Sequence, residues 1–266
     1  MSSFSIFVSS SDSYSDIWDV FFDMFQKMWP EYNGTIYLQT QEKEYHHEGL
    51  NIVSTKVGKM KDFGTTLHTG LDKIKEDAFL FMMIDYLFMG RVNDAKMEEY
   101  FKFFQAKDAD SLRLIEESFD HFEKTNNKDI IKCLPPAPHR FFSYQIAFWK
   151  KQALKKMALP HETPWSSEYY GDKRAHLIPL NLYSIKSNDL MPIVYDGRGC
   201  LHRGKWLDNA VNFLKEQNYS IDFSKRGLYD NDYQKSHWRV SWMIKRDGLK
   251  GSYLDLLLRH LKLRRC

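Results

Sequence analysis

Short apolar runs alternate with helical patterns along the first part of the chain. We predict buried strands at four such runs, residues 4–8, 35–38, 50–54 and 78–84. Apolar residues recur at helical spacing from a cap at Ser15 or Asp16 to Pro30, over residues 62–75 and over residues 93–105. Alternating strands and helices favour an α/β fold whose mostly parallel sheet is flanked by helices.

The alternation weakens in the second half of the chain. We predict a strand at residues 111–115, a rigid loop at Pro135, Pro136 and Pro138, and an amphipathic helix over residues 144–157 with Trp149 inside it. A last helix covers residues 254–263. No internal repeat or low-complexity linker divides the sequence, so we expect one domain over residues 1–266.

The composition limits the class of protein but does not indicate a function. The 266 residues are 43% hydrophobic and can bury a large core, and their formal charge of +3 argues against binding nucleic acid over a wide surface. The 3 cysteines are far apart, which is typical of a reducing compartment, and no signal peptide or membrane-spanning run is evident. We expect a cytoplasmic protein.

Polar residues follow two of the predicted strands. Asp85 comes directly after the most apolar strand, and the turn after the first strand consists of Ser9, Ser10, Ser11 and Asp12. Ligands of open α/β sheets bind outside the carboxyl ends of the strands, so both segments are site candidates in one crevice. Asp85 could equally cap the turn at residues 86–90.

A later loop, residues 197–206, combines three glycines with the cations Arg198, Arg203 and Lys205 before a predicted helix. Glycines let backbone amides approach an anion and the cations supply charge, which suits a diphosphate. The spacing is not that of a P-loop. The alternative is a solvated basic loop.

Glu168 lies among aromatic residues in the segment 164–171. Aromatic rings can stack on a sugar, and desolvation can raise the pKa of a carboxylate enough for general-base work. The competing interpretation is an ordinary surface glutamate.

Taken in order, four segments resemble a family of bacterial glycosyltransferases from capsule and lipopolysaccharide gene clusters, with a GT-A-like fold. They are residues 9–18, residues 81–86 around Asp85, the pattern Tyr144, Gln145, Trp149, Pro164, Trp165 and 168–171, and residues 203–206. The resemblance spans most of the chain. It implies a donor-binding half, residues 1–110, and an acceptor-side half, residues 111–266.

The resemblance also implies substrates and residue roles. The donor would be a nucleotide-diphospho-sugar, bound by Ser9, Ser10, Ser11, Asp12, Asp85, Arg203 and Lys205. The acceptor would be a saccharide or lipid-linked saccharide, met by Gln145, Trp165 and Tyr169, with Glu168 and Asp85 as the catalytic residues.

The chain departs from the family pattern at Ile84, where the family tends to have Glu, so Asp85 stands alone as the acidic residue. Mg²⁺ or Mn²⁺ could still be held by Asp85 with substrate phosphates, or Arg203 and Lys205 could neutralise the diphosphate instead. The missing acid also favours an alternative, a weakly catalytic protein that binds a nucleotide sugar or glycan. A nucleotidyltransferase would instead show a Gly-rich basic loop after the first strand.

Cations cluster at the end of the chain, at Arg259, Lys262, Arg264 and Arg265. They predict a weak peripheral attraction to the anionic lipid of the inner membrane, near a lipid-linked acceptor. Their alternative role is to complement the dipole of an ordinary helix end.

Overall fold

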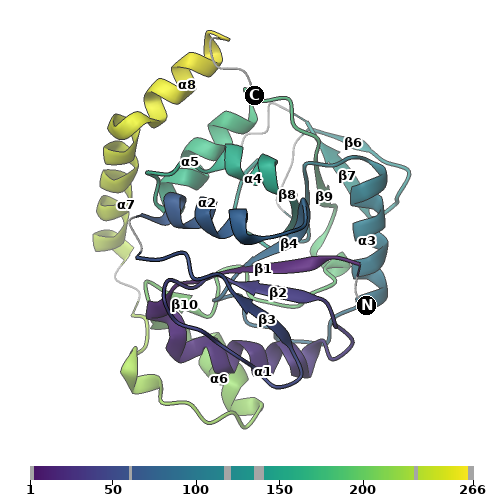
Figure 1. Ribbon diagram of the computed structural model, residues 1–266, viewed down its shortest axis with the longest axis vertical. Coiled ribbons are helices and arrows are strands. Elements are labelled where there is room, and N and C mark those ends of the chain that lie inside the picture. The colour runs from purple at the N-terminus through teal and green to yellow at the C-terminus, as the bar shows by residue number, and fades with distance from the viewer. Residues whose placement is uncertain (1–2, 60–61, 117–120, 135–140, 231–232, 263–266) are drawn as a thin grey trace.

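The protein is described by a computed structural model that covers residues 3–59, 62–116, 121–134, 141–230 and 233–262, with side chains of 233–237 excluded (Figure 1). Within these residues, nine strands form one sheet in the order β3-β2-β1-β4-β8-β5-β9-β7-β6. They are β1 (Ser5–Ser9), β2 (Thr35–Leu38), β3 (Asn51–Ser54), β4 (Ala78–Met83), β5 (Ser111–Arg113), β6 (Phe122–Lys124), β7 (Ile130–Cys133), β8 (Ala147–Lys150) and β9 (Leu182–Ile185).

Only β7 and β8 run against the other strands of this sheet, so the expected mostly parallel arrangement is confirmed. The first four strands are entirely parallel, with Ile6 of β1 beside Ile36 of β2 on one side and Leu80 of β4 on the other. The chain leaves β1 toward β2 and returns on the other side of β1 to form β4. The gap between the carboxyl ends of β1 and β4 is therefore the topological switch point, where open α/β sheets bind ligands.

Helices cover both faces of the sheet (Figure 1). The side chains of β1 alternate between two cores: Ile6 and Val8 pack in the larger core with α1 (Trp18–Met28), α3 (Asp94–Ala106) and α6 (Asp208–Glu216), while Phe7 packs in the other. That second core contains residues of α2 (Phe63–Lys73), α4 (Lys151–Met157) and α5 (Pro164–Ala175). A strand buried on both faces explains why the sequence of β1 reads as an uninterrupted apolar run.

The predicted helix over residues 144–157 is wrong in its first half. Ala147–Lys150 forms strand β8 between β4 and β5, and only Lys151–Met157 is helical. Phe148 and Trp149 are both buried, but in opposite cores of the sheet. Aromatic residues that are buried on both faces of a sheet fit a strand, and their close spacing in the sequence resembles one side of a helix.

Other predicted elements agree with the structure to within a few residues. The first helix is preceded by a 3-10 turn, Asp12–Ile17, and the last helix is α8 (Tyr253–His260), which follows α7 (Tyr233–Asp247). The proline loop at 135–138 lies outside the described residues. None of the described helices is long and apolar enough to cross a bilayer.

Candidate active site

The turn after β1 forms one wall of a cavity of about 260 Å³ at the switch point. Ser9, Ser10 and Ser11 line it, together with Tyr14, Gln39 and Asp85. The turn is held open by side-chain contacts: Gln39 Nε2 donates to the Ser10 carbonyl at 2.9 Å, and the Ser10 hydroxyl accepts from the indole N–H of Trp18 at 2.8 Å. The serines predicted to meet the donor therefore do line a cavity.

Gln39 lines this cavity, and its amide oxygen is packed so near α2 that a Cβ at Gly70 would lie 2.8 Å from it. Its side chain is 2% exposed, and its Oε1 has no hydrogen-bond partner among the described residues. A buried acceptor without a partner costs free energy unless a ligand or water satisfies it. Gln39 is thus a binding-residue candidate that the sequence alone did not single out.

Asp12, the fourth member of the predicted turn, performs a structural task. Its carboxylate accepts hydrogen bonds from the backbone N–H groups of Gln41, Glu42 and Lys43 at 2.8, 2.9 and 3.0 Å. Burial tends to raise the pKa of Asp12, but these bonds and the Lys43 charge outweigh it and leave the pKa below its usual value. Asp12 anchors the loop after β2 and does not line the cavity.

Asp85 lies beyond the carboxyl end of β4, across the switch point from the serine turn. Desolvation raises the pKa of its half-buried carboxyl to about 7, although a hydrogen bond with its own backbone partly offsets the effect. Gly199 covers the carboxyl so closely that a Cβ there would sit 2.9 Å from Oδ2. The glycine-rich loop is fixed in this place because Cys200 N–H donates to the Asp85 carbonyl at 2.6 Å.

A second cavity of about 230 Å³ adjoins the first and shares Tyr14 and Asp85 with it. Its other lining residues include Trp165, Glu168, His202 and Arg203. The two cavities together form what we call the cleft. Asp85 lies where its two halves meet.

Helix α5 positions Trp165 and Glu168 in the second cavity of the cleft. Thr163 caps this helix in a reciprocal pair with Ser166, and Pro164 occupies its first turn, so the helix begins sharply at the edge of the cleft. One oxygen of Glu168 accepts from Tyr144 N–H at 2.9 Å, which orients the carboxylate in the same cavity as Asp85. Trp165 beside it is 40% exposed and offers an open aromatic face.

The glycine-rich loop folds back on itself as a tight pair of strands, β10 (Leu201–His202) and β11 (Lys205–Trp206). Arg203 and Gly204 make the turn with φ values of 54° and 78°. Arg203 lines the cleft, whereas Lys205 is exposed on β11 and does not line either cavity. The loop thus brings one of its two predicted donor-binding cations into the cleft.

Gln145 and Tyr169 lie outside the lining of the cleft. The Gln145 amide donates to the Gly197 carbonyl at 2.9 Å and accepts from the Tyr195 hydroxyl at 3.0 Å, so it supports the glycine-rich loop from behind. The ring of Tyr169 lies under the ammonium group of Lys173, 4.7 Å from its centroid.

Arg226 contacts both the turn after β1 and the glycine-rich loop. It pairs with the Asp16 carboxylate, donates to the carbonyls of Ser13 and Gly204 at 3.0 and 3.3 Å, and lies over the ring of Tyr14 at 4.8 Å. These contacts join the turn after β1 to the glycine-rich loop. The sequence around Arg226 matches no motif, so no local signal could have identified it.

His202 is a second residue that the sequence did not single out. It lines the second cavity of the cleft, with its ring 4.4 Å from that of Tyr229. Burial, and then the neighbouring charge of Arg203, lower the pKa of His202. The imidazole is therefore neutral at neutral pH and can accept a proton.

A divalent cation would find few ligands in the cleft. No group of three or more His, Cys, Asp or Glu side chains suited to a metal occurs within the described residues. Asp12 is engaged by backbone N–H groups and Asp16 by Arg226. The residues fit Mg²⁺ or Mn²⁺ only as Asp85 alone, with waters and ligand phosphates completing the shell.

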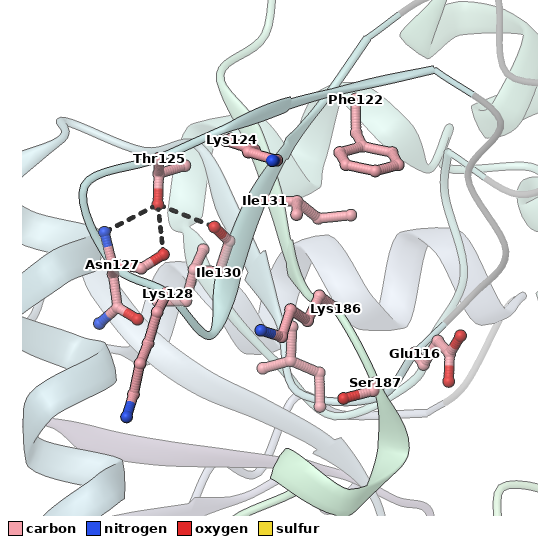
Figure 2. A pocket seen from close by; sticks show the side chains of 11 residues that line it. Glu116, Phe122, Lys124, Thr125, Asn127, Lys128, Ile130, Ile131, Lys186 and Ser187 are labelled. Atoms are coloured by element: carbon pink, nitrogen blue, oxygen red, sulfur yellow. Dashed lines mark hydrogen bonds between the residues drawn. The ribbon is translucent and has the colours of Figure 1, made fainter.

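A larger cavity of about 760 Å³ lies at the same edge of the sheet, farther along the strand order, beside β9, β7 and β6. Figure 2 shows Lys124, Lys128 and Lys186 around it, with Phe122 and Ile131 forming an apolar wall. Hydrogen bonds of the Thr125 hydroxyl hold the turn between β6 and β7. Lysines over an apolar wall suit the binding of an anionic group, whereas the acid and base candidates gather in the cleft.

No family model matches the chain, and no curated protein matches it in sequence. Among solved structures, residues 1–349 of TarS from S. aureus in complex with UDP-GlcNAc show 11% identity and a TM-score of 0.49, covering 84% of this chain and 69% of that one. TarS 1–349 in a second structure shows 13% identity and a TM-score of 0.44, covering 69% and 58%.

The bifunctional IspDF from Campylobacter jejuni shows 8% identity and a TM-score of 0.40, covering 72% of this chain and 51% of that one. The chain thus spans between 51% and 69% of the length of these three structures. Because the likenesses are so distant, function has to be inferred from the residues of the cleft.

Proposed function

We propose that the protein is a GT-A-type glycosyltransferase that moves a sugar from a nucleotide-diphospho-sugar to a saccharide or lipid-linked saccharide. The observation that carries the proposal is the position of Asp85, at the topological switch point and between two adjoining cavities. One cavity is lined by serine hydroxyls and the other by an aromatic ring and a carboxylate. That division suits a nucleotide on one side and a sugar acceptor on the other.

The donor side offers the groups that a nucleotide needs. Tyr14, whose ring has Arg226 on one face, lines this side and can contact a base, and the serine hydroxyls can meet the ribose. Gln39 lines the same cavity and can contact the nucleotide once its buried amide turns toward it. Arg203 places positive charge in the cavity that adjoins Asp85, while Arg226 is paired with Asp16 and holds the glycine-rich loop through the Gly204 carbonyl. Arg203 would stabilise the departing diphosphate, and a Mg²⁺ or Mn²⁺ ion on Asp85 would supply further charge of the same kind.

The acceptor side offers a base. In the proposed reaction the bond between the anomeric carbon and the diphosphate oxygen breaks, and the acceptor oxygen forms the new bond to that carbon. Glu168 takes the acceptor's hydroxyl proton, as an inverting transfer requires. Trp165 provides the stacking face that holds the acceptor ring. The Thr163 cap of α5 and the hydrogen bond from Tyr144 N–H to Glu168 keep both side chains at the cleft.

The cellular setting extends the proposal. The resemblance of the four sequence segments supports an acceptor from capsule or lipopolysaccharide synthesis, and the buried free thiols Cys133 and Cys200 suit the reducing cytoplasm. The role in capsule or lipopolysaccharide synthesis and the cytoplasmic location are both consistent with a nucleotide-sugar donor.

One observation favours a second candidate, a protein that binds a nucleotide sugar or glycan with little turnover. Ile84 lines the donor side of the cleft and is 3% exposed, where the family that the sequence resembles tends to have a second acid. A cleft with a single carboxylate at this point would bind the donor but stabilise its departure less.

Calorimetry with a panel of nucleotide sugars, with and without Mn²⁺, followed by a donor-hydrolysis assay, tests both candidates. We expect at least one uridine or guanosine diphosphate sugar to bind and to be hydrolysed slowly, and Asp85→Asn to abolish hydrolysis. Glu123→Gln, an exposed carboxylate on β6, is the matched control. Binding without hydrolysis or transfer would favour the second candidate, and no binding to any donor would overturn both.

A further inference from the structure

Helices α7 and α8 form an arm at one side of the molecule (Figure 1). Seven large apolar side chains on this arm are between 49% and 76% exposed: Trp238, Trp242, Leu249, Tyr253, Leu254, Leu257 and Leu261. They recur at helical spacing and continue across the kink at Gly251, whose φ of 148° favours glycine. We call this surface the α7–α8 face.

Buried hydrogen bonds attach the arm to the body, together with a ring contact between Tyr253 and Tyr170. The buried Asp247 accepts from the Ser166 hydroxyl at 2.6 Å and from Thr163 N–H at 3.1 Å. The Tyr170 hydroxyl donates to the Ile244 carbonyl at 2.8 Å. An ordinary surface helix packs its apolar side inward, so this arm is inverted, and its apolar stripe is held outward by specific bonds.

A second buried network fixes α8 in the same orientation. Arg174 of α5 pairs with Glu162 and with Asp255 of α8, and Asp255 also accepts from Arg259 at 3.1 Å. Arg259 is only 9% exposed, so this predicted lipid-attracting cation is engaged inside the protein. Arg264 and Arg265 lie outside the described residues.

The acidic side chains of the arm are buried, whereas its exposed charged side chains are basic. Both acids among its described side chains, Asp247 and Asp255, are buried. The exposed charged groups beside the apolar stripe are cations, Arg239, Lys245, Lys250 and Lys262. A surface that is apolar along its centre and positive beside it is complementary to an anionic lipid bilayer.

We propose that the α7–α8 face is a docking surface for an anionic bilayer. The leucines would enter the boundary between headgroups and acyl chains, the tryptophans and Tyr253 would lie at headgroup level, and the cations would meet lipid phosphates. A second copy of the chain is a poorer occupant because a two-fold dimer sets the same surface against itself and brings cations of like sign together.

This docking would place the cleft beside the membrane. The same helix α5 that carries Trp165 and Glu168 also supports α7 through Ser166 and Tyr170. A lipid-linked acceptor could then reach the acceptor side of the cleft without leaving the bilayer. That consequence rests on the proposed function, whereas docking itself does not.

Vesicle flotation tests the docking directly, with no substrate present. We expect the full-length protein to float with vesicles of phosphatidylcholine and phosphatidylglycerol, and much less with phosphatidylcholine alone. Replacing Trp238 and Trp242 together by Ser should reduce the bound fraction at least about tenfold, since two aromatic side chains leave the lipid. Phe122→Ser, which removes a 48% exposed aromatic residue of β6, is the matched control and should float like the wild type.

A charge-reversed variant tests the electrostatic part. Lys245→Glu combined with Lys250→Glu should weaken flotation with anionic vesicles, and added salt should weaken that of the wild type. Circular dichroism melting curves should be unchanged because all four side chains are exposed. Equal flotation of the wild type and the tryptophan variant would overturn the proposal. So would a wild-type dimer in light scattering that the tryptophan variant loses, because that result assigns the face to a second copy. Neither result depends on whether a nucleotide sugar binds.

Discussion

At the scale of single residues, the cleft is defined by polar groups whose surroundings leave them unsatisfied. Asp85 is a carboxyl that desolvation makes hard to ionise, and Gln39 Oε1 is a buried acceptor without a described partner. Asp12, in the turn after β1, is by contrast engaged by three backbone N–H groups. Groups that cost stability in the empty protein are good candidates for ligand contact, whereas satisfied groups hold the structure.

Asp85→Asn should stabilise the fold in a pH-dependent way. The pKa of Asp85 is raised from its usual 3.8 to about 7, so the folded protein binds the proton more tightly, and ionisation penalises folding as the pH rises through this range. We expect Asp85→Asn to raise the free energy of unfolding relative to the wild type. This gain should be near zero at about pH 4, grow as the pH rises, and level off above about pH 7. It should reach on the order of 2 kcal/mol, below the ~4 kcal/mol of the whole shift, because the side chain is partly exposed.

Urea unfolding of the wild type and Asp85→Asn across this pH range measures the difference in the free energy of unfolding. Glu123→Gln should show no such trend because its carboxylate is exposed. A difference that is constant with pH would contradict the assignment of a desolvated carboxyl at this position.

Gln39→Met should weaken donor binding while leaving the fold nearly as stable. The substitution loses the bond to the Ser10 carbonyl but also removes a buried acceptor that lacks a partner, so the two effects on stability oppose each other. A lost donor contact costs about 1–2 kcal/mol, or roughly tenfold in affinity. Calorimetry with the donor found in the panel measures this loss.

Gln41→Met is the matched control for Gln39→Met. The Gln41 side chain also carries a buried polar atom without a described partner, Nε2, but it does not line the cleft. An equal loss of donor affinity in the two variants would show that disturbance of the loop after β2, rather than a contact to the donor, is responsible.

At the scale of elements, the sequence predicted those parts of the fold that follow one local rule. β1 and β4 are uninterrupted apolar runs, and helix α3 has regular helical spacing with a capping Asn93 that accepts from Lys96 N–H at 3.0 Å. β8 was missed because Phe148 and Trp149 are buried on opposite faces, and the partners that decide their conformation, β4 and β5, are distant in sequence.

The arm formed by α7 and α8 was predicted only in its second half, and its inverted orientation was not predicted at all. The pattern of an amphipathic helix does not say which side faces the protein. That choice is made by Arg174, which lies on α5 and pairs with Glu162 and Asp255. In the same way, the sequence is enough to place Asp85 at the end of a strand. The contacts of Arg226 with the turn after β1 and with the glycine-rich loop depend on the tertiary fold.

Arg174→Met should release α8 from the body. Removing the guanidinium leaves two carboxylates buried without their cation, Glu162 with 0% and Asp255 with 1% of the side chain exposed. Breaking such a network costs about 3–5 kcal/mol. We expect a lower free energy of unfolding and early proteolytic cleavage within residues 233–262. Lys173→Met, at the neighbouring exposed position, should change neither, and equal stability of the two variants would contradict this account of the arm.

At the scale of the whole molecule, the cleft is assembled from both halves of the chain. The cavity proposed for the donor is lined by the turn after β1 and by Gln39, and the cavity proposed for the acceptor is lined by α5 and the glycine-rich loop. Because the two sides share only a few residues around Asp85, binding of the donor and activation of the acceptor are separable. That separation gives the proposed mechanism a sharp test.

Glu168→Gln should abolish transfer and leave donor binding intact. The amide keeps the size of the side chain and can still accept from Tyr144 N–H, but it cannot take the proton of an acceptor hydroxyl. Loss of a general base lowers the turnover rate by about 10²–10⁴. A transfer assay with the identified donor measures this rate, and calorimetry measures the donor affinity, which should match that of the wild type.

His202→Gln is the comparison that decides between the two bases of the cleft. His202 lines the same cavity, and its lowered pKa keeps it neutral, so it is the rival proton acceptor. If Glu168 is the base, the His202 variant retains most of the transfer rate. Undiminished transfer by Glu168→Gln together with a large loss in His202→Gln would move the role to the imidazole, and it would place the base on the glycine-rich loop instead of on helix α5.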